Sequence, residues 1–376
     1  MIIGVLKDIL NENRVCLTPS NVASLLKLSG LSIFVENGAG ESSYIANGLY
    51  EESGAKLCSR DEVISSSDII LQVNAPDEKT LSLIKDDTII VGALNPLHNL
   101  ELVKALTKRA MNAFSLDLIP RTSSRGQSMD ILSSMASIAG YKSVLWAANH
   151  SAKFLPMFMT AAGTIRPAKV LILGAGVAGL QAIATAKRLG AVVSAFDVRS
   201  AVKEQVNSLG AKFIEVEGAT EDQSAGGYAV EQSEEYKKKQ AELIQEQALA
   251  SDIIITTAQI PGKKAPLLIT ESTINNMMAG SIIVDLAAST GGNTELTKNN
   301  EIISINDVTI NGNSYFPSQL SMSASKMFGN NMHNFIKLMI DEEGNLKLDF
   351  NDELIAGTCL TYKGEVKNER VQSMLN

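Results

Sequence analysis

The sequence is poor in the residues that build metal centres and disulfide frameworks. Its 376 residues include only three histidines and three cysteines, Cys16, Cys58 and Cys359. The cysteines are far apart and odd in number, so we expect neither a disulfide scaffold nor a CxxC pair. A reducing, cytoplasmic compartment is the default expectation for such a chain, and no metal site is predicted.

Positive charge and long apolar runs are also scarce. The chain has 33 basic and 41 acidic residues, a net charge of −8, which argues against nucleic acid or an anionic membrane surface as the main partner. The longest apolar stretch, residues 170–186, is broken by three glycines and Gln181, so a strand and a helix explain it better than a membrane span. The amino-terminal residues lack a basic segment and a cleavage site, and we expect no secretory signal and no direct membrane insertion.

Short apolar runs that favour strands alternate with segments that favour helices, a pattern typical of α/β proteins with parallel sheets. In the first half these runs occupy residues 2–6, 32–35, 69–73, 88–91 and 112–115. In the second half they occupy residues 169–173, 192–196, 212–214, 252–256, 281–285 and 302–305. Residues 128–152 and 321–339 have apolar side chains at helical spacing and are predicted to be long helices.

The pattern predicts an α/β fold of two doubly wound, Rossmann-like domains, linked by long helices and with a nucleotide cleft between them. The first domain is expected to comprise residues 1–132 together with 312–376, and the second residues 133–311. The charged segment 231–247 is interpreted as a solvated helix. The tail from residue 345 to 365 is predicted to form a short strand pair and a loose end.

A glycine-rich turn separates a strand from a helix in the second predicted domain. The run 169–173 leads directly into Gly174, Gly176 and Gly179, and a helix is predicted over residues 180–189. Gly174 permits a tight turn, Gly176 lets backbone approach a pyrophosphate, and Gly179 lets the helix pack close to the strand. Unpaired N–H groups at the helix start attract phosphate. This order of elements predicts a dinucleotide site.

An acidic residue follows the next strand. Asp197 comes after the run 192–196, about 20 residues past the last glycine, where a carboxylate accepts hydrogen bonds from the adenosine ribose. The carboxylate repels a 2′-phosphate, so NAD(H) is predicted rather than NADP(H). Arg199 leaves the alternative open, because a nearby arginine can accommodate that phosphate.

Further short motifs, in order along the chain, carry a resemblance to a known family. They are RGQSMDILSS at 125–134, AGY at 139–141, GAGVAGL at 174–180, FDVR at 196–199, GYA at 227–229, TTA at 256–258, IPGK at 260–263, VDLAA at 284–288 and GGN at 291–293. This set resembles the NAD(H)-binding α subunit of proton-translocating NAD(P) transhydrogenase, within the alanine dehydrogenase and transhydrogenase family. The resemblance extends through nearly the whole chain.

The resemblance implies an oxidoreductase component that passes hydride from NADH to NADP⁺ held on a partner subunit. It also implies a homodimer that is peripheral at the inner face of the membrane, through membrane-embedded and NADP(H)-binding partner subunits. Hydride transfer between two nicotinamides moves no proton at the reacting carbons, so it requires no general acid or base. Catalysis would depend on holding the two rings in contact.

By resemblance, the nicotinamide end of the site comprises Gln127, Asp130, Ser133 and one arginine. Gln127 would contact the nicotinamide, and Asp130 would orient the arginine. Arg121 is the predicted arginine and Arg125 the alternative, because residues 121–125 are one residue longer than the family pattern. Residue types alone would equally fit the capped first turn of a helix.

The resemblance assigns four further residues to the nucleotide. Gly227 and Tyr228 would belong to a loop that closes over it, and Val177 and Ala258 would line the adenine and ribose. From residue types alone, the first two would fit an ordinary surface loop and the last two the apolar core.

Alanine dehydrogenase shares this architecture and is the alternative to exclude; a nucleotide-binding module without redox activity is another. In alanine dehydrogenase the counterpart of Arg14 holds a keto-acid carboxylate. The lysine of that enzyme corresponds to Asn74 here, its aspartate to Ser289, and its histidine has no counterpart in register, since His98 is the nearest. Without these groups oxidative deamination has no proton carrier.

The acid at position 197 generates a binding prediction. The chain is expected to bind NADH at least tenfold more tightly than NADPH, because each 1.4 kcal/mol of repulsion of the 2′-phosphate changes affinity about tenfold. Fluorescence titration with both nucleotides measures the ratio. Equal affinities would show that Asp197 does not select the nucleotide.

Overall fold

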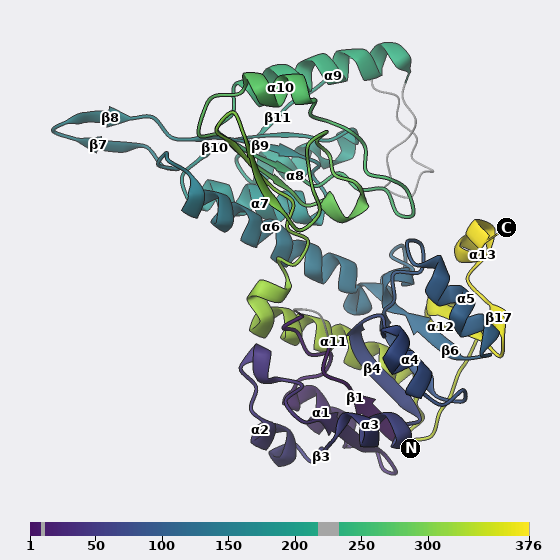
Figure 1. Ribbon diagram of the computed structural model, residues 1–376. Coiled ribbons are helices and arrows are strands. Elements are labelled where there is room, and N and C mark those ends of the chain that lie inside the picture. Colours follow the sequence, from purple (N-terminus) through teal and green to yellow (C-terminus); the bar gives the residue numbers. More distant parts are fainter. Residues whose placement is uncertain (9–11, 217–232, 376) are drawn as a thin grey trace. The chain divides into compact units, whose positions relative to one another are not determined.

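The computed structural model describes residues 1–8, 12–216 and 233–375 (Figure 1). The chain divides into two compact units, unit 1 with Met1–Met135 and Ser318–Asn376, and unit 2 with Ala136–Pro317. These boundaries lie a few residues further along the chain than the sequence predicts. Helix α6 (Ile131–His150) contains the first of them.

Unit 1 contains an eight-stranded sheet in the order β17-β16-β6-β5-β4-β1-β2-β3. Its strands are β1 (Ile2–Val5), β2 (Ser32–Glu36), β3 (Lys56–Cys58), β4 (Ile69–Asn74), β5 (Ile89–Ala93), β6 (Asn112–Ser115), β16 (Cys359–Tyr362) and β17 (Glu365–Val366). The first six are parallel, and β16 pairs antiparallel with both its neighbours. Apolar side chains of the strands pack into two buried clusters, as expected for parallel strands covered on both faces.

Helices and short 3₁₀ turns connect these strands. They are α1 (Pro19–Leu25), α2 (Asn47–Glu52), α3 (Arg60–Ser66), α4 (Glu78–Leu83), α5 (Leu100–Lys108), α11 (Ser321–Met339), α12 (Glu353–Thr358), α13 (Glu369–Leu375), η1 (Glu41–Ser43), η2 (Leu116–Leu118), η3 (Gly126–Met129) and η7 (Ser318–Leu320). The short strand pair predicted within residues 345–365 corresponds to β16 and β17. Helix α13, which the sequence did not predict, follows it, and its Val371 is fully buried.

Unit 2 contains a seven-stranded sheet in the order β11-β10-β9-β12-β13-β15-β14. Its strands are β9 (Lys169–Leu173), β10 (Val192–Phe196), β11 (Lys212–Phe213), β12 (Ile253–Thr256), β13 (Ile282–Asp285), β14 (Ile302–Ile305) and β15 (Val308–Asn311). All are parallel except β14, which pairs antiparallel with β15. Its helices are α7 (Val177–Arg188), α8 (Lys203–Ser208), α9 (Glu234–Leu249) and α10 (Glu271–Asn276), with the 3₁₀ turns η4 (Ser200–Val202) and η6 (Ala288–Thr290).

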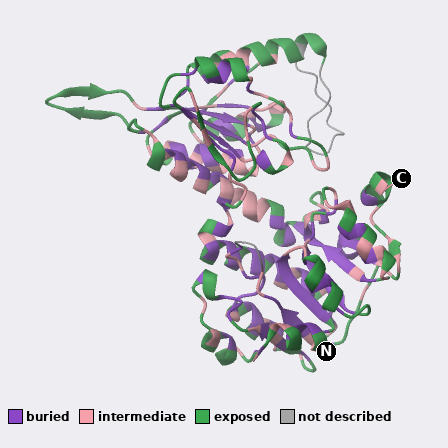
Figure 2. Cartoon of the chain, viewed as in Figure 1, coloured by how far each residue is buried: buried purple, intermediate pink, exposed green. Residues whose placement is uncertain are grey.

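A hairpin of β7 (Phe158–Thr160) and β8 (Gly163–Ile165) belongs to unit 2 but joins neither large sheet. Every residue of the two strands is exposed, whereas the strands of the main sheet are mostly buried (Figure 2). The sequence did not predict this hairpin. In the part of the chain that the structure describes, no helix is both long and apolar enough to span a bilayer.

The two large sheets arrange their first five strands in the same order, third-second-first-fourth-fifth, and confirm the predicted α/β fold of two doubly wound units. In each, the order reverses beside the first parallel strand, between β1 and β4 in unit 1 and between β9 and β12 in unit 2. The connections from the two strands leave in opposite directions at that point and open a crevice at the carboxyl ends of the strands, where ligands of such folds bind.

The close approach of α7 to the preceding turn generates a stability prediction. A Cβ at Gly179 would lie 1.8 Å from the Gly174 carbonyl oxygen, so Gly179→Ala is expected to lower the free energy of unfolding by about 1–3 kcal/mol. The control is Gly48→Ala in α2, where a Cβ meets no atom within 4 Å. Urea unfolding of both variants measures the difference, and equal stabilities would contradict the expectation.

Candidate dinucleotide site

The turn after β9 is fixed from two sides. Gly174 has a φ of +100°, which strongly favours glycine. Its N–H donates to the Phe196 carbonyl at the end of β10 over 2.8 Å, and its carbonyl accepts from the Thr257 hydroxyl over 3.0 Å. The turn therefore sits at the carboxyl ends of β9, β10 and β12, at the place predicted for a ligand.

The amino-terminal end of α7 provides unpaired donors beside this turn. The first N–H groups of a helix have no partner within the helix, and the residue before α7, Gly176, supplies no side-chain cap. The nearest atom to a Cβ placed on Gly176 would be a guanidinium nitrogen of Arg199, 3.9 Å away. Backbone N–H groups and open space together fit a pyrophosphate. Val177 is half-buried at the first position of the helix.

Asp197 is held by four donors. One carboxylate oxygen accepts from the Ala175 N–H (2.7 Å) and an Arg199 guanidinium nitrogen (2.9 Å), and the other from the Arg199 N–H and Nε (both 2.9 Å). The hydrogen bond to Asp197 raises the pKa of Arg199. Because two carboxylate oxygens offer about four acceptor positions, a ribose hydroxyl has to replace a bond from Arg199.

A second carboxylate, Asp285 at the end of β13, is fully buried. Its oxygens accept from the hydroxyls of Thr256 and Thr297 and from the backbone N–H groups of Ala287, Asn293 and Thr294, over 2.6–3.3 Å. Sequence reasoning did not assign a role to Asp285. Its signal was an acid at the last position of a strand whose other residues are all apolar.

Asn293 connects this carboxylate to Ala258. Its side-chain oxygen accepts from the Ala258 N–H over 3.1 Å, and its NH₂ group donates to the Ala258 carbonyl over 2.9 Å. The same NH₂ group donates to the Pro266 carbonyl over 2.8 Å. The loop after β12, where Ala258 was predicted to line the nucleotide, is thus fixed by Asn293, which the sequence reasoning also missed as a positioning residue.

In unit 1, three of the predicted catalytic residues lie together. Arg121 Nε donates to Asp130 over 3.0 Å, another guanidinium nitrogen donates to the Ser133 hydroxyl over 3.0 Å, and that hydroxyl donates to Asp130 over 2.6 Å. Arg125 instead pairs with Asp352 over 2.7 Å. Of the two candidate arginines, Arg121 is the one that contacts Asp130.

Gln127 lies on η3 with an exposed side chain. That side chain makes no hydrogen bond to any residue within the described ranges. Its position is therefore set by the backbone of η3. The remaining predicted site residues, Gly227 and Tyr228, lie outside the residues that the structure describes.

The crevice between β1 and β4 in unit 1 contains a paired arginine. Arg14 donates through Nε and a terminal nitrogen to both oxygens of Glu12, over 2.7 and 2.6 Å. Asn74 donates to Glu12 over 3.1 Å and to Asp8 over 3.2 Å. Burial opposes ionisation of Glu12, but the hydrogen bonds and charge of Arg14 lower its pKa overall. The arginine thus already binds a carboxylate of its own chain.

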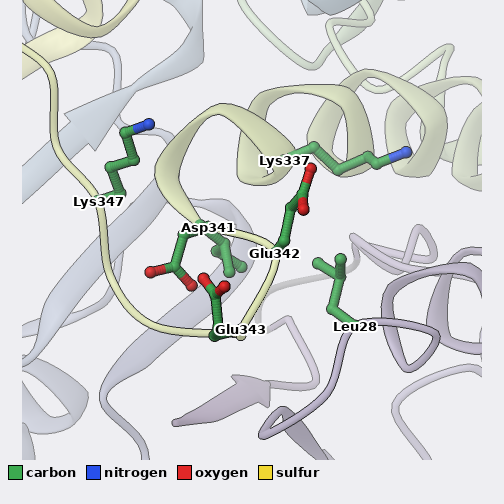
Figure 3. Close-up of a pocket in the computed structure, with 7 residues that line it drawn as sticks. Leu28, Lys337, Asp341, Glu342, Glu343 and Lys347 are labelled. Carbon is green, nitrogen blue, oxygen red and sulfur yellow. The ribbon is translucent and has the colours of Figure 1, made fainter.

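Another hollow, of about 440 Å³, lies at the carboxyl end of α11 and contains none of the predicted site residues (Figure 3). It is lined by Leu28, Lys337, Ile340, Asp341, Glu342, Glu343 and Lys347. Among the described residues, no group of three or more histidines, cysteines or acids is arranged to hold a metal ion. This hollow adds nothing to the dinucleotide site.

Two family descriptions match the chain. Residues 4–139 match "Alanine dehydrogenase/PNT, N-terminal domain" and residues 143–369 match "Alanine dehydrogenase/PNT, C-terminal domain". The chain is 45% identical to NAD(P) transhydrogenase subunit alpha of Haemophilus influenzae, over 97% of this chain and 71% of that one. It is also 45% identical to a shorter NAD(P) transhydrogenase subunit alpha protein of Rhodospirillum rubrum, over 94% of each. The solved transhydrogenase structure from Sinorhizobium meliloti matches with a TM-score of 0.88 and 40% identity, covering 97% of this chain and 100% of that one.

The buried carboxylate of Asp285 generates a prediction that couples stability to binding. Asp285→Asn replaces one carboxylate oxygen by an NH₂ group, which then faces two or three of the five donors. We therefore expect a loss of about 2–3 kcal/mol in the free energy of unfolding. NADH affinity should fall as well, because the loop at Ala258 depends on this carboxylate through Asn293.

Urea unfolding and NADH titration measure the two effects. The control is Asp252→Asn, since Asp252 accepts from the Lys169 N–H and Lys153 at the opposite edge of the same sheet. This control is expected to leave NADH affinity unchanged. Normal NADH affinity in Asp285→Asn would contradict its role in holding the site.

Proposed function

We propose, from the premise that this chain belongs to the alanine dehydrogenase/PNT family, that it is the NAD(H)-binding component of a proton-translocating NAD(P) transhydrogenase. Hydride would pass from NADH to NADP⁺ bound on a partner subunit. The observation that carries the proposal is the internal pairing of Arg14 with Glu12. The arginine of unit 1 that could bind a substrate carboxylate is thus already paired within the chain. The turn of unit 2 would still accept a dinucleotide.

The residues of unit 2 would bind and orient the nucleotide. The N–H groups at the start of α7 would hold the pyrophosphate, and Asp197 would accept from the ribose once Arg199 yields a bond. The loop at Ala258 would provide a fixed wall, because Asn293 bonds both its N–H and its carbonyl. Gly227 and Tyr228 would close over the nucleotide.

The residues of unit 1 would hold the nicotinamide. Gln127 carries a carboxamide, which both donates and accepts, and so matches the carboxamide on the nicotinamide ring. Asp130 fixes the side chains of Arg121 and Ser133, which limits the positions that the guanidinium can take. NADH supplies the hydride when bound, and these groups need only keep its ring at about 3–3.5 Å from the acceptor ring.

The alternative of an amino-acid dehydrogenase is disfavoured by the same crevice in unit 1. A keto-acid carboxylate would have to displace Glu12 from Arg14, and the side chain of Glu12 is only 1% exposed. Asn74 stands where that enzyme has a lysine, and it donates to Asp8 and Glu12. Unlike a lysine, its amide is uncharged and cannot transfer a proton. A nucleotide-binding module without redox activity would bind NADH but would transfer no hydride to NADP⁺.

The hairpin of β7 and β8 supports a homodimer. Apolar side chains in β7 and just before it are well exposed, with Met157 at 60%, Phe158 at 44% and Met159 at 71%. The rings of Phe154 and Phe158 stack at a centroid distance of 4.9 Å. Contiguous exposed apolar residues usually mark an interaction site, and a second copy of this chain is the proposed occupant. The dimer would associate with the inner face of the membrane through its partner subunits.

The decisive experiment mixes the purified chain, NADH and a purified NADP(H)-binding transhydrogenase subunit. Hydride transfer that requires both proteins is expected. Gln127→Asn should slow transfer by about 10²-fold, because shortening the side chain moves its carboxamide by roughly 1 Å, while NADH affinity changes much less. Stopped-flow transfer rates and NADH titration provide the two measurements.

Arg121→Ala and Arg125→Ala separate the two candidate arginines. The first is expected to slow transfer, whereas the second removes only an exposed ion pair with Asp352 and should leave the rate near that of the parent. Alanine-dependent reduction of NAD⁺ by this chain alone would contradict the proposed function. Equal losses of affinity and rate in Gln127→Asn would make Gln127 a binding residue only.

A further inference from the structure

The short turn η3, which carries Gln127, is bonded from outside by the long helix α11. Two side chains of α11, Asn331 and Asn334, donate to a single acceptor, the carbonyl of Ser128, over 2.8 and 3.1 Å. The two asparagines are three positions apart and therefore share one face of the helix. Both bonds end on the residue that directly follows Gln127.

Two hydrogen bonds at the ends of η3 are longer than the bonds from α11. The Asp130 N–H reaches the Gln127 carbonyl over 3.4 Å, and the Ser128 hydroxyl reaches the Arg125 carbonyl over 3.3 Å. Both distances exceed the usual N–H···O and O–H···O lengths. The bonds from α11 are shorter than both and hold the middle of the turn from outside.

The residues just before η3 also contact the start of α12, through side chains that are exposed to solvent. Ser123 donates to Glu353 over 2.6 Å and Arg125 pairs with Asp352 over 2.7 Å, at the start of α12. The side chain of Arg125 is 56% exposed, and exposed ion pairs contribute little to stability. Among the described residues, the side chains that donate to the carbonyl of Ser128 are Asn331 and Asn334 of α11.

We propose that Asn331 and Asn334 are positioning residues that hold Gln127, through the carbonyl of Ser128, in the orientation needed for hydride transfer. The inference rests on the proposed function, in which Gln127 contacts the nicotinamide. The chain segment after residue 317 would then help to position the site, although none of its residues was predicted to act there.

A purely stabilising role explains Asn331 poorly. The residue is only 6% exposed, and its side-chain oxygen has no hydrogen-bond partner among the described residues. Leaving a buried carbonyl oxygen unpaired costs about as much as one hydrogen bond contributes. The bond to Ser128 therefore adds little net stability, and what it provides is a fixed position.

Hydrogen exchange in the free chain tests the positioning directly. Asn334→Asp keeps the shape of the side chain but loses the donor, and Asn331→Ala loses the other donor. In each variant the amide hydrogens of residues 126–130 should exchange about tenfold faster, because local opening of the turn becomes easier. Mass spectrometry of the corresponding peptides measures this rate.

Asn330→Asp is the matched control. It makes the same change of charge on the same helix, but Asn330 accepts from Asn21 and does not touch Ser128. Its exchange at residues 126–130 should equal that of the parent chain. Unchanged exchange in Asn331→Ala and Asn334→Asp, or an equal increase in Asn330→Asp, would overturn the proposal.

Transfer kinetics distinguish positioning from general damage. Asn331→Ala and Asn334→Asp should slow hydride transfer about tenfold or more, with the NADH dissociation constant within about twofold of the parent and an unchanged thermal midpoint. In a Gln127→Asn background, the loss caused by Asn334→Asp should be much smaller, since residues that act through one another are not additive. Additive losses would show that Asn334 acts elsewhere.

The two proposals can fail separately. If Gln127→Asn transfers hydride at the parent rate, the proposed role of Gln127 is wrong, and the exchange measurement still decides whether α11 fixes the turn. If Gln127→Asn is slow while the two asparagine variants transfer normally, the proposed function stands and the positioning role is wrong.

Discussion

Carboxylates that accept backbone N–H groups where parallel strands end are the interaction on which both units depend. The strands are buried on both faces, so donors in the connecting turns have little access to water and need partners from the protein. Asp197 accepts from the turn after β9, and Asp285 from the loop after β13. Asp8 accepts from the last residues of β4. At the opposite edge of the unit 2 sheet, Asp252 accepts from the start of β9.

These carboxylates at the strand ends have different consequences in the two units. In unit 2, Asp197 holds the turn before α7 and Asp285 holds the loop after β13, while the start of α7 has no side-chain cap. In unit 1, the carboxylates of Asp8 and Glu12 take up the donors of Asn74 and Arg14. The two switch points therefore differ in their side chains. Arg14 of unit 1 is paired within the chain, whereas the start of α7 in unit 2 has no side-chain cap. The difference between the two units thus comes from the side chains at the switch point and not from the fold.

Sequence periodicity was sufficient for most strands, because a buried parallel strand needs an uninterrupted apolar run. The runs 169–173 and 192–196 match the parallel strands β9 and β10 residue for residue. The hairpin of β7 and β8 was missed because its strands are exposed and show no alternation of buried and exposed positions. Strand β3 was missed because it is short, with one of its three residues buried. Helix α13 was missed because its burial depends mainly on one side chain, Val371.

The sequence by itself determined the two α/β units and the glycine turn, because strand periodicity and glycine spacing are local properties. It also provided the candidates Arg121 and Arg125, but it could not choose the partner of either. Only the tertiary structure placed Arg121 on Asp130 and Arg125 on Asp352. It likewise showed that Arg14 is held by Glu12 and that Asn331 and Asn334 meet at Ser128. Most of these contacts join residues distant in sequence, and all depend on how side chains orient once the chain has packed.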